Sequence, residues 1–127
     1  GALLAPPRAT GRAVAHWLKL RARDRLAPAA EAAAERLGRR VGRVTLRDTR
    51  SRWGSCTAKG DLAFSWRLAM APEAVQDYVA AHEAAHLVEM NHGPRFWALV
   101  AELCPGYRGQ RAWLRREGPA LHRFRFD

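Results

Sequence analysis

The sequence predicts an α+β fold, with a small antiparallel sheet in the middle of the chain and helices in both the N-terminal and the C-terminal parts. Three observations support this prediction. Strong helix formers dominate residues 10–38. Short segments rich in β-branched and aromatic residues follow over residues 41–68, and helical periodicity returns from Pro72 onward. A run of strands followed by a run of helices is typical of an α+β domain.

The N-terminal third is expected to form two helices. Thr10 is a suitable N-cap, and an apolar stripe at helical spacing continues from Val14 to Leu26. Pro28 is expected to end this helix, because proline lacks the N–H group that the helix needs. The segment AAEAAAERLG then predicts a second helix that ends at Gly38, a residue suited to the left-handed conformation of a C-terminal cap.

The middle of the chain predicts three strands. Their sequences are VGRVTLRDTR, SRWGSCT and DLAFSWRL, and AKGD between the last two is typical of a turn. The short connections favour a small antiparallel sheet.

The second half predicts three helices. The first begins at Pro72 and is expected to run to about Met90, because its first turn is acidic and it contains no Gly or Pro. A second is expected over residues 94–105 and a third over 107–118, whereas the tail PALHRFRFD follows no clear pattern.

Length and composition fit one domain over residues 1–127, with a helical part over 1–40 and the sheet and remaining helices over 41–127. No apolar run approaches the roughly 18 residues of a membrane span, so we expect no membrane association. The start GALLAPPRAT lacks both an initiator Met and the features of a secretory signal, and we expect an upstream segment to be missing. Cys56 and Cys104 are too few for a disulfide framework, so we expect free thiols in a reducing cytoplasm.

The charge of the chain allows two interpretations. A net charge of +10 suggests an anionic partner, either a nucleic acid or a nucleotide. However, the cations are scattered, and 20 of the 22 are Arg in a chain that is also rich in Ala. This bias is typical of a GC-rich genome, and a solvated basic surface is the preferred interpretation.

The stretch HEAAH is an H-E-x-x-H motif within a predicted helix. Four residues advance a helix by about 400 degrees, so His82 and His86 project from one face and can share a metal ion. Val75 and Val79 lie on the same side, which turns the pair toward a packed interior or a cleft. Glu83 lies about 100 degrees round the helix, where a carboxylate can accept a proton from water.

A third histidine follows the motif. Asn91 tolerates the left-handed conformation that ends a helix, and Gly93 with Pro94 prevents immediate continuation, so the chain can bring His92 back toward the pair. Three ligands leave one position open, as in catalytic zinc sites. The alternatives are hydrogen-bonded polar histidines without a metal, or a structural site closed by a cysteine, although no C-x-x-C pair supports the latter.

Four blocks of sequence, SRWGSC, GDLAFSWRLAMAP, YVAAHEAAHLVEMNHGPRFWALVAELCPGY and RAWLRREG, occur in this order within roughly residues 44–118. Together they resemble the YgjP-like metallopeptidase domain, which is related to the SprT-like and gluzincin-type zinc peptidases. The resemblance implies a zincin-like fold, in which the sheet lies beside an active-site helix. It also implies that His82, His86 and His92 bind Zn²⁺ and that Glu83 is the catalytic base.

Two positions depart from related patterns. Family members tend to carry a larger aliphatic residue where this chain has Ala84, which lies off the ligand face. Glu89 occupies the position of the glycine in the metzincin motif H-E-x-x-H-x-x-G-x-x-H. The helix is therefore expected to run further before it turns, and we do not assign the metzincin family.

Further candidates for substrate binding or transition-state stabilisation are Arg52, Trp53, Arg67, Tyr107 and His122. The two arginines could hold an oxyanion, a carboxylate or a phosphate, or could simply be surface residues. Trp53 and Gly54 could belong to an edge strand to which an extended peptide adds, or to the core and a close backbone approach. Glu89 could orient a ligand or face solvent. Apolar residues at helical spacing after Pro94 are expected to be core.

The sequence therefore predicts a cytoplasmic zinc-dependent hydrolase, foremost a metallopeptidase that cleaves a peptide or protein. In this hypothesis Glu83 accepts the proton of the attacking water and later protonates the leaving amine. Two alternatives stay open. One is a zinc-dependent phosphohydrolase that acts on a nucleotide, and the other is a nucleic-acid-binding module.

Overall fold

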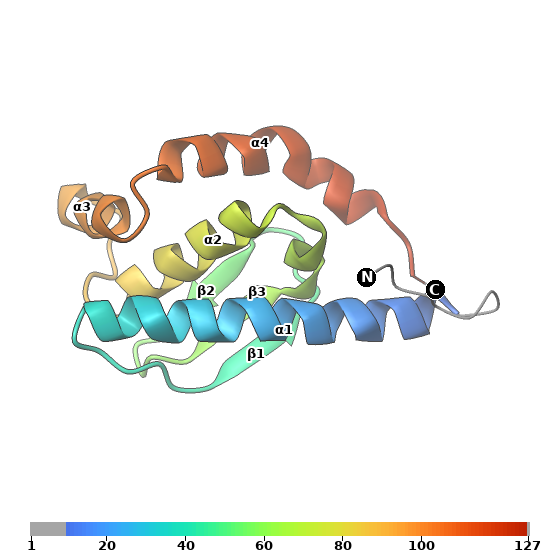
Figure 1. Cartoon of the computed structure of the whole chain (residues 1–127), viewed down its shortest axis with the longest axis horizontal. Coiled ribbons are helices and arrows are strands. Elements are labelled where there is room, and N and C mark those ends of the chain that lie inside the picture. The colour runs from blue at the N-terminus through green and yellow to red at the C-terminus, as the bar shows by residue number, and fades with distance from the viewer. Residues whose placement is uncertain (1–9, 127) are drawn as a thin grey trace.

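The computed structural model describes residues 10–126. The expectation of a missing upstream segment rests on the first ten residues, and nearly all of these lie outside the described residues. Its elements are α1 (Gly11–Arg36), β1 (Val44–Arg47), β2 (Gly54–Cys56), β3 (Leu62–Ser65), the 3-10 helix η1 (Trp66–Met70), α2 (Glu73–Ala85), α3 (Pro94–Leu103) and α4 (Tyr107–Arg123). Figure 1 shows α2 between α1 and α4, and it also contacts α3 and β2. This arrangement confirms the predicted α+β fold.

Helix α1 is continuous, so the predicted break at Pro28 is wrong. Thr10 caps the helix as expected, because its Oγ1 accepts the N–H of Ala13 at 3.2 Å. Pro28 is exposed, while Leu26 and Ala30 on either side of it are fully buried. Packing of these turns outweighs the backbone hydrogen bond that proline cannot make.

The sheet is mixed rather than antiparallel, with strand order β1-β3-β2. The hairpin of β2 and β3 forms as predicted, and Gly60 in its turn has a φ of +91°. However, β1 pairs parallel to the other edge of β3, with Val44 opposite Leu62 and Leu46 opposite Phe64. This register places the apolar side chains of both strands on one face, toward the core.

Helix α2 ends at Ala85, five residues before the predicted end at Met90. After Ala85 the backbone hydrogen bonds join residues three apart, as in a 3-10 turn, for example from the N–H of His86 to the carbonyl of Glu83 at 3.1 Å. Within residues 10–126 only glycines have a positive φ, so Asn91 does not adopt the predicted left-handed conformation. The reversal is spread over the turn that follows α2 instead.

Helix α4 continues through Pro119 to Arg123, beyond the predicted end near Gly118. Gly118 is buried, and a Cβ there would lie 2.9 Å from Cζ2 of Trp53. This glycine therefore allows a close approach of helix and tryptophan, and it does not terminate the helix.

The core lies between the sheet and the helices. Its largest fully buried side chains are Phe64, Phe96, Leu26, Leu62, Leu68, Val75 and Val100. No helix among residues 10–126 combines the length and the apolarity needed to cross a bilayer.

Candidate metal centre

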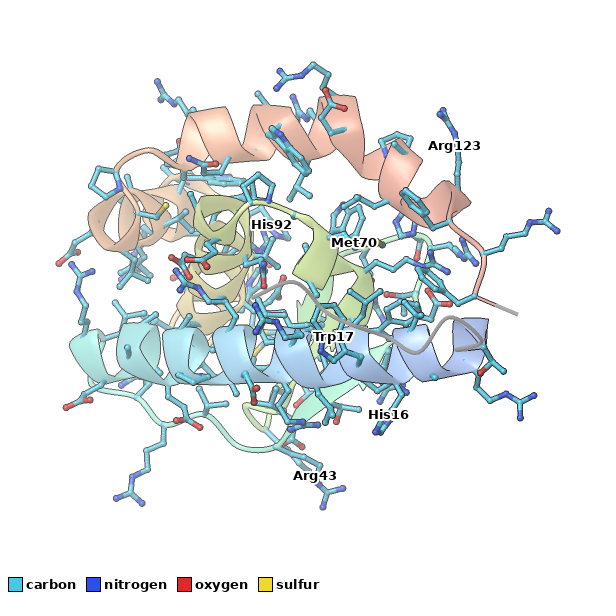
Figure 2. All side chains as sticks on the ribbon, turned by 45° about the vertical axis from the view of Figure 1, so that its right-hand side comes forward. His16, Trp17, Arg43, Met70, His92 and Arg123 are labelled. Carbon is cyan, nitrogen blue, oxygen red and sulfur yellow. The ribbon has the colours of Figure 1, made fainter. Side chains whose placement is uncertain are left out.

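Three histidines converge at the end of α2, as the sequence predicts. Each of His82, His86 and His92 offers a ring nitrogen, and these atoms all lie within 4.8 Å of one another. The Nε2 atoms of His86 and His92 are 3.1 Å apart. Figure 2 shows His92 beside α2 and beneath α4, so the turn after α2 does bring it back to the pair.

In His82 and in His86, a neighbouring oxygen atom determines which ring nitrogen carries the proton. Nδ1 of His86 lies 3.1 Å from the backbone carbonyl of Glu89, and Nδ1 of His82 lies 3.1 Å from Oε2 of Glu83. Because a carbonyl or carboxylate oxygen can only accept, both Nδ1 atoms must donate. Each Nε2 therefore keeps a free lone pair for a metal ion. Glu89 acts on His86 through its main chain, a role that no side-chain pattern indicates.

The packing around the histidines is aromatic. Phe96, which is fully buried, stacks on His86 with 4.4 Å between ring centroids and meets His82 edge-on at 4.9 Å. Burial lowers the pKa of His92, and the neighbouring His86 and His82 lower it further. A lowered pKa favours the neutral imidazole, which is the form that binds metal.

Glu83 lies against the edge strand β2. Its side chain is only 5% exposed, and a Cβ on Gly54 of β2 would lie 2.8 Å from its Oε2 atom. Both interpretations of Gly54 hold, because it lies in the edge strand β2 and also marks a close approach, whose partner is the carboxylate of the H-E-x-x-H motif. Burial, followed by the charge of Glu83, raises the pKa of Cys56 in the same strand to about 11. Both cysteines are free thiols, as predicted.

The donor set fits a metal ion such as Zn²⁺. Ligands about 2.0–2.1 Å from a tetrahedral ion stand roughly 3.3 Å apart, close to the 3.1 Å between the two Nε2 atoms. If both nitrogens kept their lone pairs, they would repel each other at this distance without a cation between them. Three imidazoles and no cysteine in the cluster are typical of a catalytic site, which leaves one position open.

The match to a known family extends over most of the chain. Residues 4–117 match the family described as YgjP-like, metallopeptidase domain. The chain belongs to the YgjP-like metallopeptidase family. No curated protein and no solved structure matches the chain.

One cation beside the histidines of this YgjP-like domain was not predicted from the sequence. Arg111 of α4 lies with Cζ 4.6 Å from the centroid of Trp97, whose ring is 5.7 Å from that of His82. Its charge is among the influences that lower the pKa of His92, and it opposes the burial that raises the pKa of Tyr78 to about 12. Arg111 comes four residues after Tyr107 on one helical face, and this spacing could have indicated it.

The remaining predicted candidates of the YgjP-like chain fall into two groups. Tyr107 stacks on Trp97 at 5.4 Å and so lies near the histidines. Trp53 stacks on His122 at 4.4 Å, and Arg52 just before β2 lines two hollows, one on the sheet and one against α4. Arg67 is 3% exposed and its guanidinium donates to Asp48 at 2.7 Å, so we no longer expect it to bind substrate.

Proposed function

We propose that this chain is a zinc-dependent metallopeptidase in which His82, His86 and His92 hold the metal and Glu83 is the general base. One observation carries the proposal. A buried carboxylate lies directly beside three imidazoles whose ring nitrogens lie within 4.8 Å of one another. When bound, Zn²⁺ would supply a Lewis acid and lower the pKa of water toward about 7.

Glu83 is suited to proton transfer. The N–H of His82 holds its carboxylate at 3.1 Å, and Gly54 limits its movement from the other side. A carboxylate fixed in this way can accept a proton from water and then donate it to the leaving amine. Burial at 5% exposure keeps bulk water from competing for the carboxylate.

The sheet edge offers a place for the peptide. Among the described strands β2 pairs with β3 alone, so its outer edge has free backbone N–H and C=O groups. An extended peptide that pairs with this edge would run past Gly54 and so past Glu83. Main-chain pairing makes affinity depend little on sequence, and a broad side-chain preference follows.

Arg111 is suited to hold negative charge. Its guanidinium has no carboxylate partner among residues 10–126, and the face of Trp97 holds it in place. It can stabilise the oxyanion that develops on the scissile carbonyl, or bind the carboxylate of a short peptide. Tyr107, stacked on the same tryptophan, is a second possible donor.

The first experiment combines metal content and hydrolysis. Glu83→Gln should keep one zinc per chain by elemental analysis and lose cleavage of a fluorogenic peptide library. His92→Ala should lose both, and His16→Ala, which changes an exposed histidine on α1, should lose neither. A fully active Glu83→Gln protein would contradict the assigned role, and a wild type that binds no zinc would overturn the proposal.

Arg111 is tested by a matched pair of variants. Removing a donor to an oxyanion lowers activity by about 100-fold to 1,000-fold in comparable sites, so Arg111→Met should lose activity on this scale. Arg115→Met, which removes an exposed arginine from the same helix, should stay near wild type. Equal activity of the two variants would exclude this role for Arg111.

A phosphohydrolase is the second candidate, and Arg111 is the observation that favours it. The same guanidinium can bind a phosphate as well as a carboxylate, and an activated water can attack phosphorus. Nucleotides belong in the substrate panel for this reason. Phosphate release from a nucleotide without cleavage of any peptide would select this alternative.

A further inference from the structure

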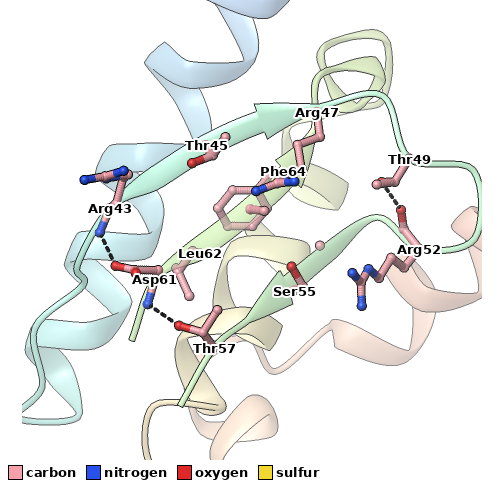
Figure 3. Close-up of a pocket in the computed structure, with 12 residues that line it drawn as sticks. Arg43, Thr45, Arg47, Thr49, Arg52, Ser55, Thr57, Asp61, Leu62 and Phe64 are labelled. Carbon is pink, nitrogen blue, oxygen red and sulfur yellow. Dashed lines mark hydrogen bonds between the residues drawn. The ribbon is translucent and has the colours of Figure 1, made fainter. Parts of the chain in front are cut away.

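The sheet has a hollow on the face opposite the metal centre. Side chains alternate along a strand, so Ser55 points away from the face on which Gly54 meets Glu83. Around Ser55 lies a hollow of about 340 Å³, shown in Figure 3. Every residue that lines it lies between positions 43 and 64, and none belongs to a helix.

Three arginines surround this hollow, and we call Arg43, Arg47 and Arg52 the arginine face. Among residues 10–126 none of their guanidinium groups has an ion-pair or hydrogen-bond partner, whereas Arg25 and Arg67 are both paired with aspartates. The lining contains one carboxylate, and three arginines against one aspartate leave it a net charge of +2.

The single carboxylate has a structural role. Oδ1 of Asp61 accepts the backbone N–H of Arg43 at 2.8 Å, and the backbone N–H of Asp61 donates to the Thr57 hydroxyl at 3.1 Å. These hydrogen bonds connect the start of β3 to the segment before β1 and to the segment after β2. The carboxylate thus holds the backbone of the hollow and leaves the three guanidinium groups free.

Small residues form the floor between the arginines. Thr45, Ala63 and Ser55 lie opposite one another across the three strands. The first and last of them place hydroxyl groups on this face. A chain of phosphates can approach this floor closely because the residues that form it are small, and the side chain of Arg47 reaches over it (Figure 3).

The cations are spread out and do not converge. Arg43 and Arg47 are four residues apart on extended backbone, so their Cα atoms are about 13 Å apart. Figure 3 shows Arg43 and Arg52 on opposite sides of the hollow. On a duplex, 13 Å corresponds to about four phosphates of one strand, at 3.4 Å each along the axis. This spacing fits a polyanion better than a single phosphate.

The lining residues also indicate which part of a nucleic acid this hollow would contact. Its one aromatic residue, Phe64, is 1% exposed and cannot stack on a base. Arginines and hydroxyls are the groups that contact phosphates, and such contacts carry no base sequence. We propose that the arginine face binds the phosphodiester backbone of nucleic acid without sequence preference.

The test is the salt dependence of binding to a labelled mixed-sequence DNA duplex, measured by fluorescence anisotropy. Each phosphate contact contributes about 0.9 to the slope of log K against log salt, so R43Q/R47Q/R52Q should lower the slope by about 2.7. The control R12Q/R108Q/R123Q changes the net charge equally at exposed residues of α1 and α4 and should leave the slope nearly unchanged. Arg43 and Arg123 project from different sides of the molecule (Figure 2).

Further variants make the result specific. R43K/R47K/R52K should keep most of the binding, because lysine also binds phosphate as a point charge. Glu83→Gln and chelation should leave binding unchanged, so failure of the proposed peptidase would not affect this result. Equal losses in the face and control variants would overturn the proposal. So would absence of salt-dependent binding by wild type, or equal displacement of DNA by polyglutamate at the same charge concentration.

Discussion

Replacing Gly54 with alanine tests whether Glu83 is the base. The added Cβ would lie 2.8 Å from both Cγ and Oε2 of Glu83, whereas ordinary contact begins near 3.4 Å. The carboxylate must therefore move by at least the difference of these two values, about 0.6 Å. Because the obstructing atoms belong to the side chain of Glu83 and not to the backbone, the chain should still fold and keep its three histidine ligands in place.

The expected effect follows from the size of this displacement. A misplacement of 1 Å in a catalytic group can cost about 100-fold in rate, so a shift of about 0.6 Å should cost between tenfold and a hundredfold. The assay is hydrolysis of the best peptide from the library at saturating and limiting concentrations, with zinc content measured on the same samples. The loss should occur mainly in kcat, because the ligands and the outer edge of β2 are unchanged.

Gly109→Ala is the matched control, because it makes the same chemical change on α4 where a Cβ would meet nothing within 4 Å. It should have wild-type activity. Full activity of Gly54→Ala with unchanged zinc content would refute the reasoning, since the base would then tolerate a displacement that the geometry makes unavoidable. Loss of zinc in Gly54→Ala would also refute it, because the strand would then support the ligands and not the carboxylate.

Three further predictions concern stability and reactivity. Pro28→Ala should raise the free energy of unfolding by about 2 kcal/mol in urea titrations, because α1 runs through this exposed position and alanine restores a helical hydrogen bond. A hydrogen bond from Arg67 lowers the pKa of Asp48 below its usual 3.8, so this pair should stabilise the fold above about pH 4 and lose its effect as the pH falls through the lower folded value; Asp48→Asn should therefore cost most at neutral pH, and a cost that does not shrink in acid would contradict this. With its pKa raised to about 11 from 9.0, Cys56 should react with a thiol reagent at pH 8 roughly 100-fold more slowly than a free cysteine. The rate is measured on Cys104→Ser protein, in which Cys56 is the remaining thiol, and a fast reaction would contradict the described environment.

Local patterns predicted much of the fold and the centre of the site. Thr10 as a cap and Gly60 in a hairpin turn are recognisable because the causes lie within a few residues. The H-E-x-x-H motif belongs to the same class, since the helix alone brings His82 and His86 together. His92 follows closely enough that a chain reversal could be expected from the residues around it.

The errors concern features that depend on distant parts of the chain. Pro28 stays helical because the turns beside it are buried against other elements, a tertiary effect that propensity does not contain. Strand β1 runs opposite to β2 and in the same direction as β3, so a mixed sheet results because β1 pairs with β3 and not with β2. The sequence of β1 does not specify which of these two strands it pairs with. Arg111 lies about twenty residues from the nearest histidine ligand in sequence, and only the packing of α4 over Trp97 brings it to the site.

The two proposed surfaces share strand β2, and its register controls both. Gly54 must lack a side chain because it faces Glu83, while its neighbour Ser55 faces the arginines. A slip of one residue would exchange these faces and place the serine against the carboxylate. The register is set by the pairing with β3 and by the turn at Gly60. Substitutions can therefore alter either surface alone, whereas an insertion in this hairpin should disrupt peptide hydrolysis and nucleic-acid binding together.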